Sequence, residues 1–256
     1  MNLAAPLIEI RSVVKRFSGD ADPVLDHVSI AVAKGDLVAL IGPSGCGKST
    51  VLNILAGLVT PTEGAITLSD PDARISYVFQ RPRLLPWRNV KRNVEFSLEQ
   101  TKMPTSSRRQ AAKAAIARVN LEGHEHKYPH QLSGGMQQRV ALARSLAIEP
   151  SVLLLDEPFG ALDALTRSYM QEELLGIVRG SGTTALLVTH DIDEALLLAD
   201  RVLVMSSRPG KIKHELHVPF GADRTLDALL QDPEYGRIRS ELRHLLRPEV
   251  AEELDA

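Results

Sequence analysis

The sequence predicts an α/β fold with a mainly parallel core sheet, and three observations support that prediction. Short apolar runs bounded by turn residues recur along the 256-residue chain, and helical segments alternate with them after the loop at 42–50. The hydrophobic fraction of 44% with only 4% aromatic residues is typical of an α/β protein rich in Ala, Leu and Val. No strand-like run occurs within 90–148, which predicts a helical insertion.

The individual elements follow from the same patterns in chain order. We expect strands at 7–14, 24–33, 37–41, 65–68, 75–79, 152–155, 184–189, 201–205 and 212–218. We expect helices at 51–57, 89–100, 107–119 and 136–148, and shorter ones at 226–230 and 234–246 in a polar C-terminal tail. A chain of this length buries a substantial core, as one large domain or as two small lobes.

A glycine-rich loop at 42–50 follows a buried apolar run and opens a helix. Its sequence, GPSGCGKST, meets the phosphate-loop pattern G-x-x-x-x-G-K-[ST] with Gly42, Gly47, Lys48 and Ser49. The glycines let backbone N–H groups turn inward, and the helix N-terminus adds partial positive charge. Lys48 would reach the β- and γ-phosphates, and Ser49 would ligate Mg²⁺. The predicted nucleotide contacts here are Gly42, Pro43, Ser44, Gly45, Cys46, Gly47, Lys48, Ser49 and Thr50.

Two carboxylates follow the apolar run at 152–155. Asp156 would stand at the carboxyl end of a strand, where open α/β sheets place their ligands, and would hold Mg²⁺ directly or through water. Glu157 is the candidate general base, because a carboxylate beside a metal-bound triphosphate can polarise the attacking water. The phosphate loop alone indicates nucleotide binding, which kinases, GTPases and motor proteins share.

The segment LSGGM at 132–136 narrows the class of phosphate-loop protein to which the chain can belong. Ser133 can cap the following helix, and Gly134 and Gly135 leave backbone N–H groups bare, which makes a second anion site at a helix N-terminus. One nucleotide does not need two such sites from one chain. We therefore expect each segment to bind a nucleotide held by a twin subunit's phosphate loop, so that a homodimer sandwiches two ATP molecules head to tail.

Together, GPSGCGKST, LSGGMQQR and LLLDEP resemble the ATP-hydrolysing subunit of an ABC transporter, and the resemblance runs from about Phe17 to about His190. The family more commonly has Gln where this chain has Met136, but the serine and glycines match. The resemblance implies the phosphate-loop ABC-ATPase fold, with an N-terminal antiparallel β subdomain and an inserted helical subdomain. It divides a single domain over 1–256 into a catalytic core at 1–80 and 150–220, a helical subdomain at about 88–149 and a C-terminal helical tail at 221–256.

The resemblance also implies roles for single residues. Gln80 would touch Mg²⁺ and the attacking water, and His190, after the run at 184–189, would contact the γ-phosphate. Phe17 stands where the family places an aromatic ring that stacks on adenine. The implied catalytic residues are Glu157, His190, Lys48 and Gln80; the implied Mg²⁺ ligands are Ser49, Gln80 and Asp156; and the implied contacts to the partner's ATP are Ser133, Gly134 and Gly135.

An apolar loop with flanking prolines follows Gln80. It contains Leu84, Leu85 and Trp87, the chain's only tryptophan, and such a loop suits docking of a partner helix. The alternative is a loop tucked under the helical subdomain. In ABC importers this region receives the coupling helix of the membrane permease. LLPW, together with SRPGKI at 207–212, is similar to the importer group for nitrate, sulfonates and taurine.

Charge and hydropathy limit the partners and the location. The formal net charge of −2 and the pI of about 6.5 give no indication of a nucleic-acid partner bound by bulk charge. No apolar run is long enough to span a bilayer, and residues 1–6 lack the charged start and apolar core of a signal peptide. We therefore expect the protein to stay in the cytoplasm, and the resemblance to ABC importers implies that it lies peripherally on the cytoplasmic face of the inner cell membrane.

The sequence thus predicts the ATPase subunit of a bacterial ABC importer that couples ATP binding and hydrolysis to uptake of a small anion such as nitrate, a sulfonate or taurine. The expected partners are a twin subunit, two integral-membrane permease subunits and, indirectly, an extracytoplasmic solute-binding protein. The alternatives are a soluble ABC-type ATPase, an exporter ATPase and a phosphate-loop kinase. The first usually carries tandem domains or coiled-coil arms, and the kinase has no use for the segment at 132–135.

Overall fold

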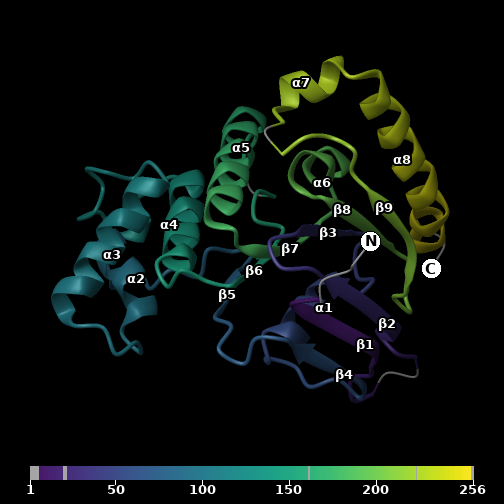
Figure 1. The fold of residues 1–256 in the computed structure, drawn as a ribbon, viewed down its shortest axis with the longest axis horizontal. Helices are drawn as coiled ribbons and strands as arrows, with labels where there is room; N and C mark the ends of the chain where they lie inside the picture. Colours follow the sequence, from purple (N-terminus) through teal and green to yellow (C-terminus); the bar gives the residue numbers. More distant parts are fainter. Residues whose placement is uncertain (1–5, 20–21, 161, 223, 255–256) are drawn as a thin grey trace. The chain divides into compact units, whose positions relative to one another are not determined.

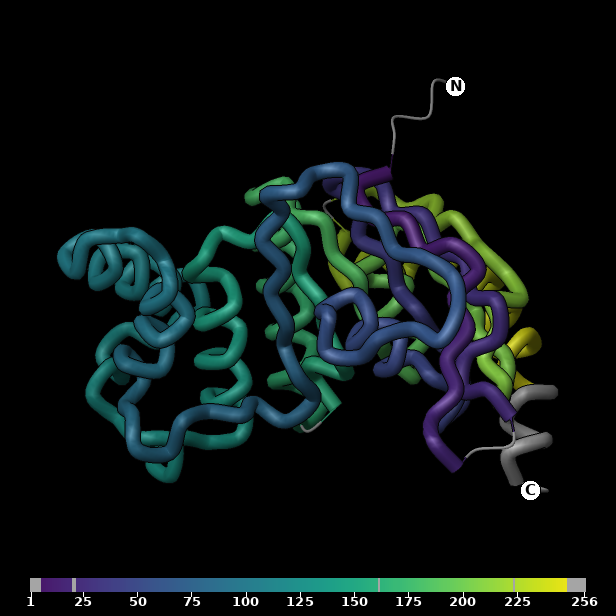
Figure 2. The backbone as a smooth tube through the Cα atoms, turned by 90° about the horizontal axis from the view of Figure 1, so that it is seen from below, coloured from purple at the N-terminus to yellow at the C-terminus, as the bar shows by residue number. Residues whose placement is uncertain are grey.

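The computed structural model describes residues 6–19, 22–160, 162–222 and 224–254 (Figures 1 and 2). The chain divides into two compact units. We call Met1–Asp72 together with Val178–Ala256 the terminal unit, and Ala73–Ile177 the middle unit. Residues 1–5, on which the expectation about a signal peptide partly rests, lie outside the described residues.

The terminal unit begins with a three-stranded antiparallel sheet. Its strands are β1 (Ile8–Lys15), β2 (Leu25–Val32) and β4 (Glu63–Leu68), in the order β2-β1-β4. In β2, buried Val28 and Ile30 alternate with more exposed residues, because successive side chains of a strand point to opposite faces of the sheet. The predicted N-terminal antiparallel β subdomain is confirmed.

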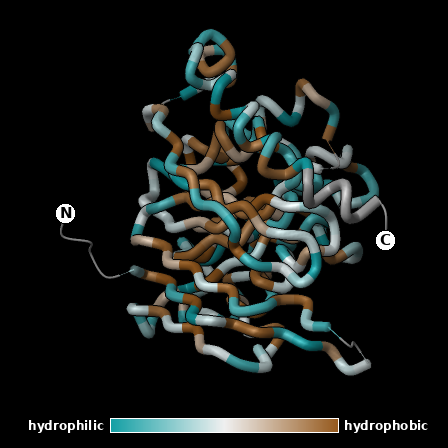
Figure 3. Tube along the Cα trace, turned by 90° about the vertical axis from the view of Figure 1, so that its right-hand side faces the viewer, coloured by the Kyte–Doolittle hydropathy of each residue, from teal (hydrophilic) through white to brown (hydrophobic). Residues whose placement is uncertain are grey.

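The same unit contains a second, mainly parallel group of strands. β3 (Leu37–Ile41) lies between β7 (Thr184–Thr189) and β8 (Arg201–Met205) and is parallel to both, while β9 (Ile212–His217) pairs antiparallel with β8. All residues of β3 and β7 are buried, as expected for strands covered on both faces. Most of these buried residues are apolar, and Figure 3 shows hydrophobic stretches, in brown, crossing the middle of the trace.

Four helices of the terminal unit cover or follow these strands. α1 (Lys48–Leu55) packs on β7, and α6 (Ile192–Leu198) packs on β3 and β7. In the C-terminal tail, α7 (Leu226–Gln231) precedes α8 (Pro233–Leu254), which packs on α6 and β8. The sequence patterns did not predict α6, because most of its residues are buried and it shows no polar stripe.

The middle unit contains a pair of parallel strands, and helices connect the first strand to the second along the chain. β5 (Ile75–Val78) pairs with β6 (Val152–Asp156), and the described residues between them form helices and loops only. The helices α2, α3 and α4 pack against one another. Helical bounds in and after this insertion are α2 (Val90–Leu98), α3 (Thr105–Arg118), the 3₁₀ turn Pro129–Gln131, α4 (Gly134–Leu146) and α5 (Ala164–Ser181), which ends in the terminal unit.

The predicted α/β fold class, including the inserted helices, is confirmed. The bounds of the predicted strands agree with the observed strands to within a few residues. The helix α5 was not predicted, because its apolar residues do not form a clear stripe. The residue bounds predicted for core, helical subdomain and tail stay a prediction. Across the described residues, no helix is both long enough and apolar enough to cross a membrane.

Candidate functional site

The phosphate loop connects β3 to α1 in the terminal unit. Gly47 is the N-cap of α1, with φ 102° and no side-chain cap. A Cβ added at Gly47 would lie 2.5 Å from Cδ2 of Leu25, so both backbone conformation and packing require glycine there. The N-terminus of α1 is therefore held in place by strand β2 and is not closed by a side chain.

Lys48 lies inside this loop and only 5% of its surface is exposed. Its ammonium group donates hydrogen bonds to the carbonyls of Gly42 at 2.8 Å and Pro43 at 2.6 Å. Cys46 is also buried, and burial raises the pKa of its thiol despite the nearby Lys48 charge. The thiol is therefore a packing group. The loop residues that are exposed are Ser44, Gly45 and Ser49.

A second loop, which contains Gly210, packs against the phosphate loop. The Gly210 backbone donates a hydrogen bond to the Val24 carbonyl and accepts one from the Asp26 amide, both at 3.0 Å. A Cβ added at Gly210 would lie 2.1 Å from the carbonyl oxygen of Cys46. The segment 207–212, which the sequence linked only to an importer group, thus lies against the phosphate loop at Gly210.

His190 follows β7 and its side chain is exposed. The hydroxyl of Thr189 donates a hydrogen bond to Glu194 and accepts one from the amide of Asp191 at 3.0 Å. The Asp191 carboxylate caps α6 by accepting from the amides of Asp193 and Glu194 at 2.9 and 3.2 Å. The residues on both sides of His190 are therefore fastened to the first turn of α6.

Phe17, the predicted adenine platform, lies two residues after the end of β1 and is 42% exposed. The ammonium group of Lys15 lies 4.8 Å from the centroid of its ring. The exposed ring can stack on a flat ligand, which is consistent with the predicted role and does not test it.

In the middle unit, the acidic pair at the end of β6 has partners from the segment of β5. The Gln80 amide donates a hydrogen bond to Oε2 of Glu157 at 2.8 Å. The Tyr77 hydroxyl donates to Oδ2 of Asp156 at 3.1 Å. Burial first, and the Asp156 charge second, raise the pKa of the Tyr77 phenol, so it remains a donor at neutral pH. The structure thus brings together Gln80 and Glu157, both of which are predicted to act on the attacking water, and their roles stay a prediction.

The backbone of Glu157 also has an unusual conformation. Its φ is 44°, in the left-handed region that residues with a Cβ rarely adopt. Such a conformation costs about 1–3 kcal/mol and is found disproportionately at functional sites. The position of this carboxylate is therefore enforced by the fold.

The segment at 132–136 begins α4 in the middle unit. Ser133 is the N-cap, and its hydroxyl accepts a hydrogen bond from the Met136 amide at 3.3 Å. A Cβ added at Gly134 would meet no atom within 4 Å. A Cβ added at Gly135 would lie 3.2 Å from Cγ2 of Thr166. The fold of this chain therefore does not itself require glycine at position 134.

The predicted docking loop exposes its aromatic residue. Trp87 is 72% exposed, while Leu84 and Leu85 are half-buried. Asn93 of α2 is fully buried, accepts from the Leu85 amide at 2.8 Å and donates to the Arg88 carbonyl at 2.7 Å. Trp87 is thus exposed on a loop that Asn93 fastens to α2, and the docking role and its alternative, a loop tucked under the helical subdomain, stay predictions.

Arg144 of α4 fastens the beginning of the same loop. Its guanidinium donates to the carbonyls of Pro82 and Arg83, both at 2.9 Å. Arg83 stacks over Phe79 at 4.1 Å, and Phe79 stacks on Tyr77 with centroids 4.1 Å apart. A continuous set of contacts therefore joins the Asp156 partner Tyr77 to the docking loop. The sequence patterns gave no signal for Arg144 or Asn93.

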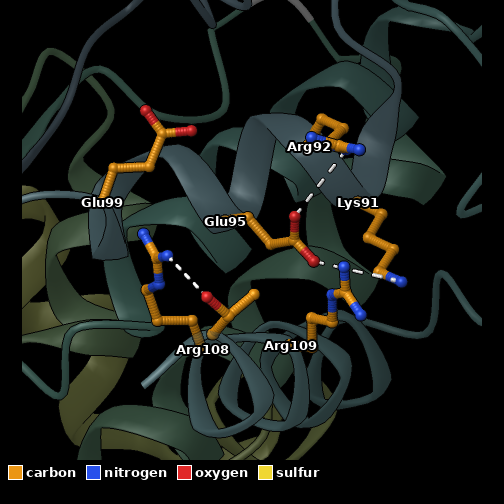
Figure 4. Close-up of a pocket in the computed structure, with 7 residues that line it drawn as sticks. Lys91, Arg92, Glu95, Glu99, Arg108 and Arg109 are labelled. Atoms are coloured by element: carbon orange, nitrogen blue, oxygen red, sulfur yellow. Dashed lines mark hydrogen bonds and ion pairs between the residues drawn. The ribbon is translucent and has the colours of Figure 1, made fainter. Parts of the chain in front are cut away.

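A separate cavity in the middle unit contains none of the predicted site residues (Figure 4). Its volume is about 140 Å³, and its lining residues are Lys91, Arg92, Glu95, Glu99, Thr105, Arg108 and Arg109. Glu95 lies 4.0 Å from the Lys91 ammonium and 3.9 Å from Arg92 Nε. The cavity is lined mainly by charged side chains of and next to α2 and α3, and it is not part of the predicted nucleotide site.

Comparison with known proteins identifies the class. A family model described as ABC transporter matches residues 25–160. The chain is 50% identical over 222 residues to the taurine import ATP-binding protein TauB of Yersinia pestis bv. Antiqua (strain Antiqua), covering 83% of this chain and 87% of that protein. It is 43% identical over 239 residues to the nitrate import ATP-binding protein NrtD of Synechococcus elongatus, covering 90% and 87%.

Solved structures of ABC transporter proteins are similar to this chain. A dimeric structure of the ATP-binding cassette MJ0796, in a post-hydrolysis state bound to ADP and Pi, has a TM-score of 0.73 and 32% identity, covering 84% of this chain and all of that one. The CbiO1 protein of Clostridium perfringens, part of the transporter complex cbiONQ, has a TM-score of 0.75 and 28% identity, covering 84% and 90%. The chain belongs to the ABC transporter family. It is an ATP-binding, ATP-hydrolysing cassette, and the predicted family, fold and enzyme class are confirmed.

Proposed function

We propose that this cassette is the ATP-hydrolysing subunit of a bacterial ABC importer for a small anion such as nitrate, a sulfonate or taurine. Relatives named for taurine and nitrate import, at 50% and 43% identity, support this proposal. From the structure, one observation carries the importer assignment. Trp87 is 72% exposed on a fastened loop in the middle unit, which is the place the sequence assigned to permease docking.

The residues present fit ATP and Mg²⁺. Packing requires glycine at position 47, and the N-terminus of α1 has no side-chain cap. The buried ammonium group of Lys48 lies in the same loop. These features suit the binding of phosphate groups. The family resemblance implies that Ser49, Gln80 and Asp156 would hold Mg²⁺, with the hydroxyl, amide and carboxylate oxygens that this ion prefers. Mg²⁺ would neutralise phosphate charge during hydrolysis.

In the proposed mechanism, catalysis rests on positioning and charge stabilisation. Lys48 binds the terminal phosphates, Gln80 and Glu157 orient and polarise the attacking water, and His190 contacts the γ-phosphate. Phe17 stacks on adenine. Ser133 with the amides of Gly134 and Gly135 acts on the nucleotide of a twin subunit, and dimeric structures of a related cassette support this arrangement.

The Glu157→Gln variant tests this mechanism. Glutamine keeps the size of the side chain but cannot accept the proton of the attacking water, so hydrolysis should fall by roughly 100-fold while ATP still binds. Persisting ATP should then shift the population toward the closed dimer. Turnover assays and gel filtration with Mg-ATP measure both effects, with Glu149→Gln as the control carboxylate. Unchanged turnover, with no gain of dimer at saturating ATP, would refute the base role.

The partners in this proposal are a twin subunit, two integral-membrane permease subunits and, indirectly, an extracytoplasmic solute-binding protein. The subunit would lie on the cytoplasmic face of the inner membrane and bind the permease through the docking loop. Asn93 and Arg144 hold that loop before the permease arrives, which lowers the entropy lost on docking. Contacts from Tyr77 through Phe79 and Arg83 would connect docking to the acidic pair.

Replacing Trp87 tests the docking role. Burying one large apolar side chain at an interface contributes roughly 1.5–3 kcal/mol, and an aspartate there would face an apolar permease helix. Trp87→Asp, alone and with Leu85→Asp, should abolish co-purification with the permease and stop uptake, yet leave ATP affinity of the isolated subunit within about 2-fold. Leu58→Asp, at a leucine 61% exposed in the terminal unit, is the matched control. If the double variant assembles and transports normally, the permease binds a different surface of this subunit.

The two other cassette functions predict different outcomes. A soluble ATPase would lose nothing measurable in the Trp87 variant, because no permease binds. An exporter cassette would lose outward transport. Uptake assays with a co-expressed permease and solute-binding protein separate these functions.

A further inference from the structure

The C-terminal helix α8 contacts the first turn of α6, the helix that directly follows His190. The Tyr235 hydroxyl donates a hydrogen bond to Oδ1 of Asp193 at 2.6 Å. The Arg239 guanidinium binds both carboxylate oxygens of Asp193, at 2.5 and 2.8 Å. A bidentate guanidinium–carboxylate pair is directional as well as strong. In Figure 1, α8 is the yellow helix at the edge of the terminal unit, next to the elements labelled α6, β8 and β9.

The other end of α6 is held from the same part of the chain. Arg224 is buried and donates hydrogen bonds to the carbonyls of Leu197 and Ala199 at the end of α6. It also binds the Phe220 carbonyl at 2.9 Å. These bonds satisfy carbonyl groups that the end of a helix leaves without intrahelical partners. Burial lowers the pKa of Arg224 to about 10, so the group stays charged at neutral pH.

The charges at Asp193 show that this contact is favourable in the folded chain. Burial opposes ionisation of the Asp193 carboxyl, but the hydrogen bonds from Arg239 and Tyr235 outweigh it, so its pKa lies below the usual range. The same carboxylate raises the pKa of Arg239. The contact therefore persists at neutral pH as a charged, hydrogen-bonded pair.

Displacement of the first turn of α6 would be transmitted to His190. Thr189, the residue before His190, is hydrogen-bonded to Glu194. Asp191, the residue after His190, accepts hydrogen bonds from the amides of Asp193 and Glu194. His190 thus projects from a short backbone segment whose two flanking residues are tied to the turn that carries Asp193.

We propose that α8 is a positioning element for ATP hydrolysis, in which Tyr235 and Arg239 fix the first turn of α6 and thereby the backbone that presents His190 to the γ-phosphate. This inference rests on the role of His190 under the proposed function. It assigns a task to the C-terminal tail, for which the sequence motifs indicated none. Tyr235 and Arg239 are positioning residues, since they act through Asp193 and do not touch nucleotide.

A double-mutant cycle with the full-length chain tests the inference. Tyr235→Phe/Arg239→Gln should lower kcat of Mg-ATP hydrolysis by roughly 10-fold, the scale of a small misplacement of a reacting group. ADP affinity should change by less than about 2-fold, because the phosphate loop is untouched. In a His190→Ala background, the same tail substitutions should have no further effect on kcat.

Arg237→Gln is the matched control. Arg237 lies on α8 but pairs only along its own helix, with Glu234 and Glu241, among the interactions of the described residues. Its substitution should leave kcat unchanged. Circular-dichroism melts check folding of every variant. If the double variant does not fold, Tyr235→Phe enters the same cycle, with faster hydrogen exchange of the Glu194 and Ala195 amides as its expected signature.

The outcomes separate the inference from the function on which it rests. Full kcat in the tail variants, or an equal fold-loss with and without His190, overturns the positioning role while leaving the ATPase mechanism intact. Full kcat in His190→Ala overturns the assigned role of His190 and the inference with it.

Discussion

The phosphate loop and the segment at 132–136 both place glycines at the start of a helix, but they are built differently. In the terminal unit, the N-cap of α1 is Gly47, whose φ is 102° and whose missing Cβ leaves room for Leu25. In the middle unit, the N-cap of α4 is Ser133, whose hydroxyl caps the helix, and a Cβ added at Gly134 would meet no atom within 4 Å. The phosphate loop is shaped by contacts within its own chain, whereas no atom of the chain occupies the space beside the Cα of Gly134.

This difference indicates why each glycine is present. At Gly47 the requirement is steric and can be read from the neighbouring atoms of the same chain. At Gly134 no neighbouring atom and no positive φ demands glycine. A glycine that the fold does not need is explained when a ligand approaches the backbone closely, as the proposed nucleotide-sandwich dimer requires.

The largest expected effect comes from removing the cation of the first site. Lys48→Ala should lower ATP turnover by roughly 100-fold or more, because a buried ammonium that meets the phosphates is lost. The lost hydrogen bonds to Gly42 and Pro43 should cost only about 1–3 kcal/mol of stability, so the fold survives. ATP binding, turnover and a circular-dichroism melt measure these effects, with the exposed Lys102→Ala as control. Normal ATP turnover in Lys48→Ala would show that the segment at 42–50 is not the phosphate loop.

Blocking the second site should act on the partner's nucleotide. Ser133→Arg should lower hydrolysis by roughly 10–100-fold, because a bulky side chain stands where a phosphate must approach. Mixed with Lys48→Ala chains, it should regain part of the activity, since one composite site then carries neither defect. Turnover of each variant alone and of the mixture is the measurement. Normal hydrolysis by Ser133→Arg would leave this segment as a helix cap only.

The smallest effect concerns stability and compares the two glycines directly. Gly47→Ala should destabilise the fold by about 1–3 kcal/mol, from the positive φ and the contact with Leu25. Gly134→Ala should change stability by less than about 0.5 kcal/mol, yet it should reduce hydrolysis. Thermal melts and turnover assays of both variants measure this contrast. Equal melts for the two variants would contradict it, and full activity of Gly134→Ala would show that the partner's nucleotide does not approach there.

The parts of the site that the sequence predicted are those whose chemistry lies within a few consecutive residues. The phosphate loop was identified because strand, glycine turn, lysine and helix follow one another without interruption. Glu157 was predicted to be the general base because it follows Asp156 at the end of an apolar run. The helix α6 was not predicted, because burial on nearly all sides removes the polar stripe that marks a helix in sequence.

The sequence alone determined the α/β class, the nucleotide chemistry and the family, because short-range patterns of apolar, glycine and charged residues specify them. Tertiary structure decided which residues hold these motifs in place. Arg144 binds carbonyls 61 and 62 residues away, and Asp193 meets Arg239 across 46 residues. Such contacts depend on packing among helices and strands that are distant in the chain, and no local pattern of residues encodes them.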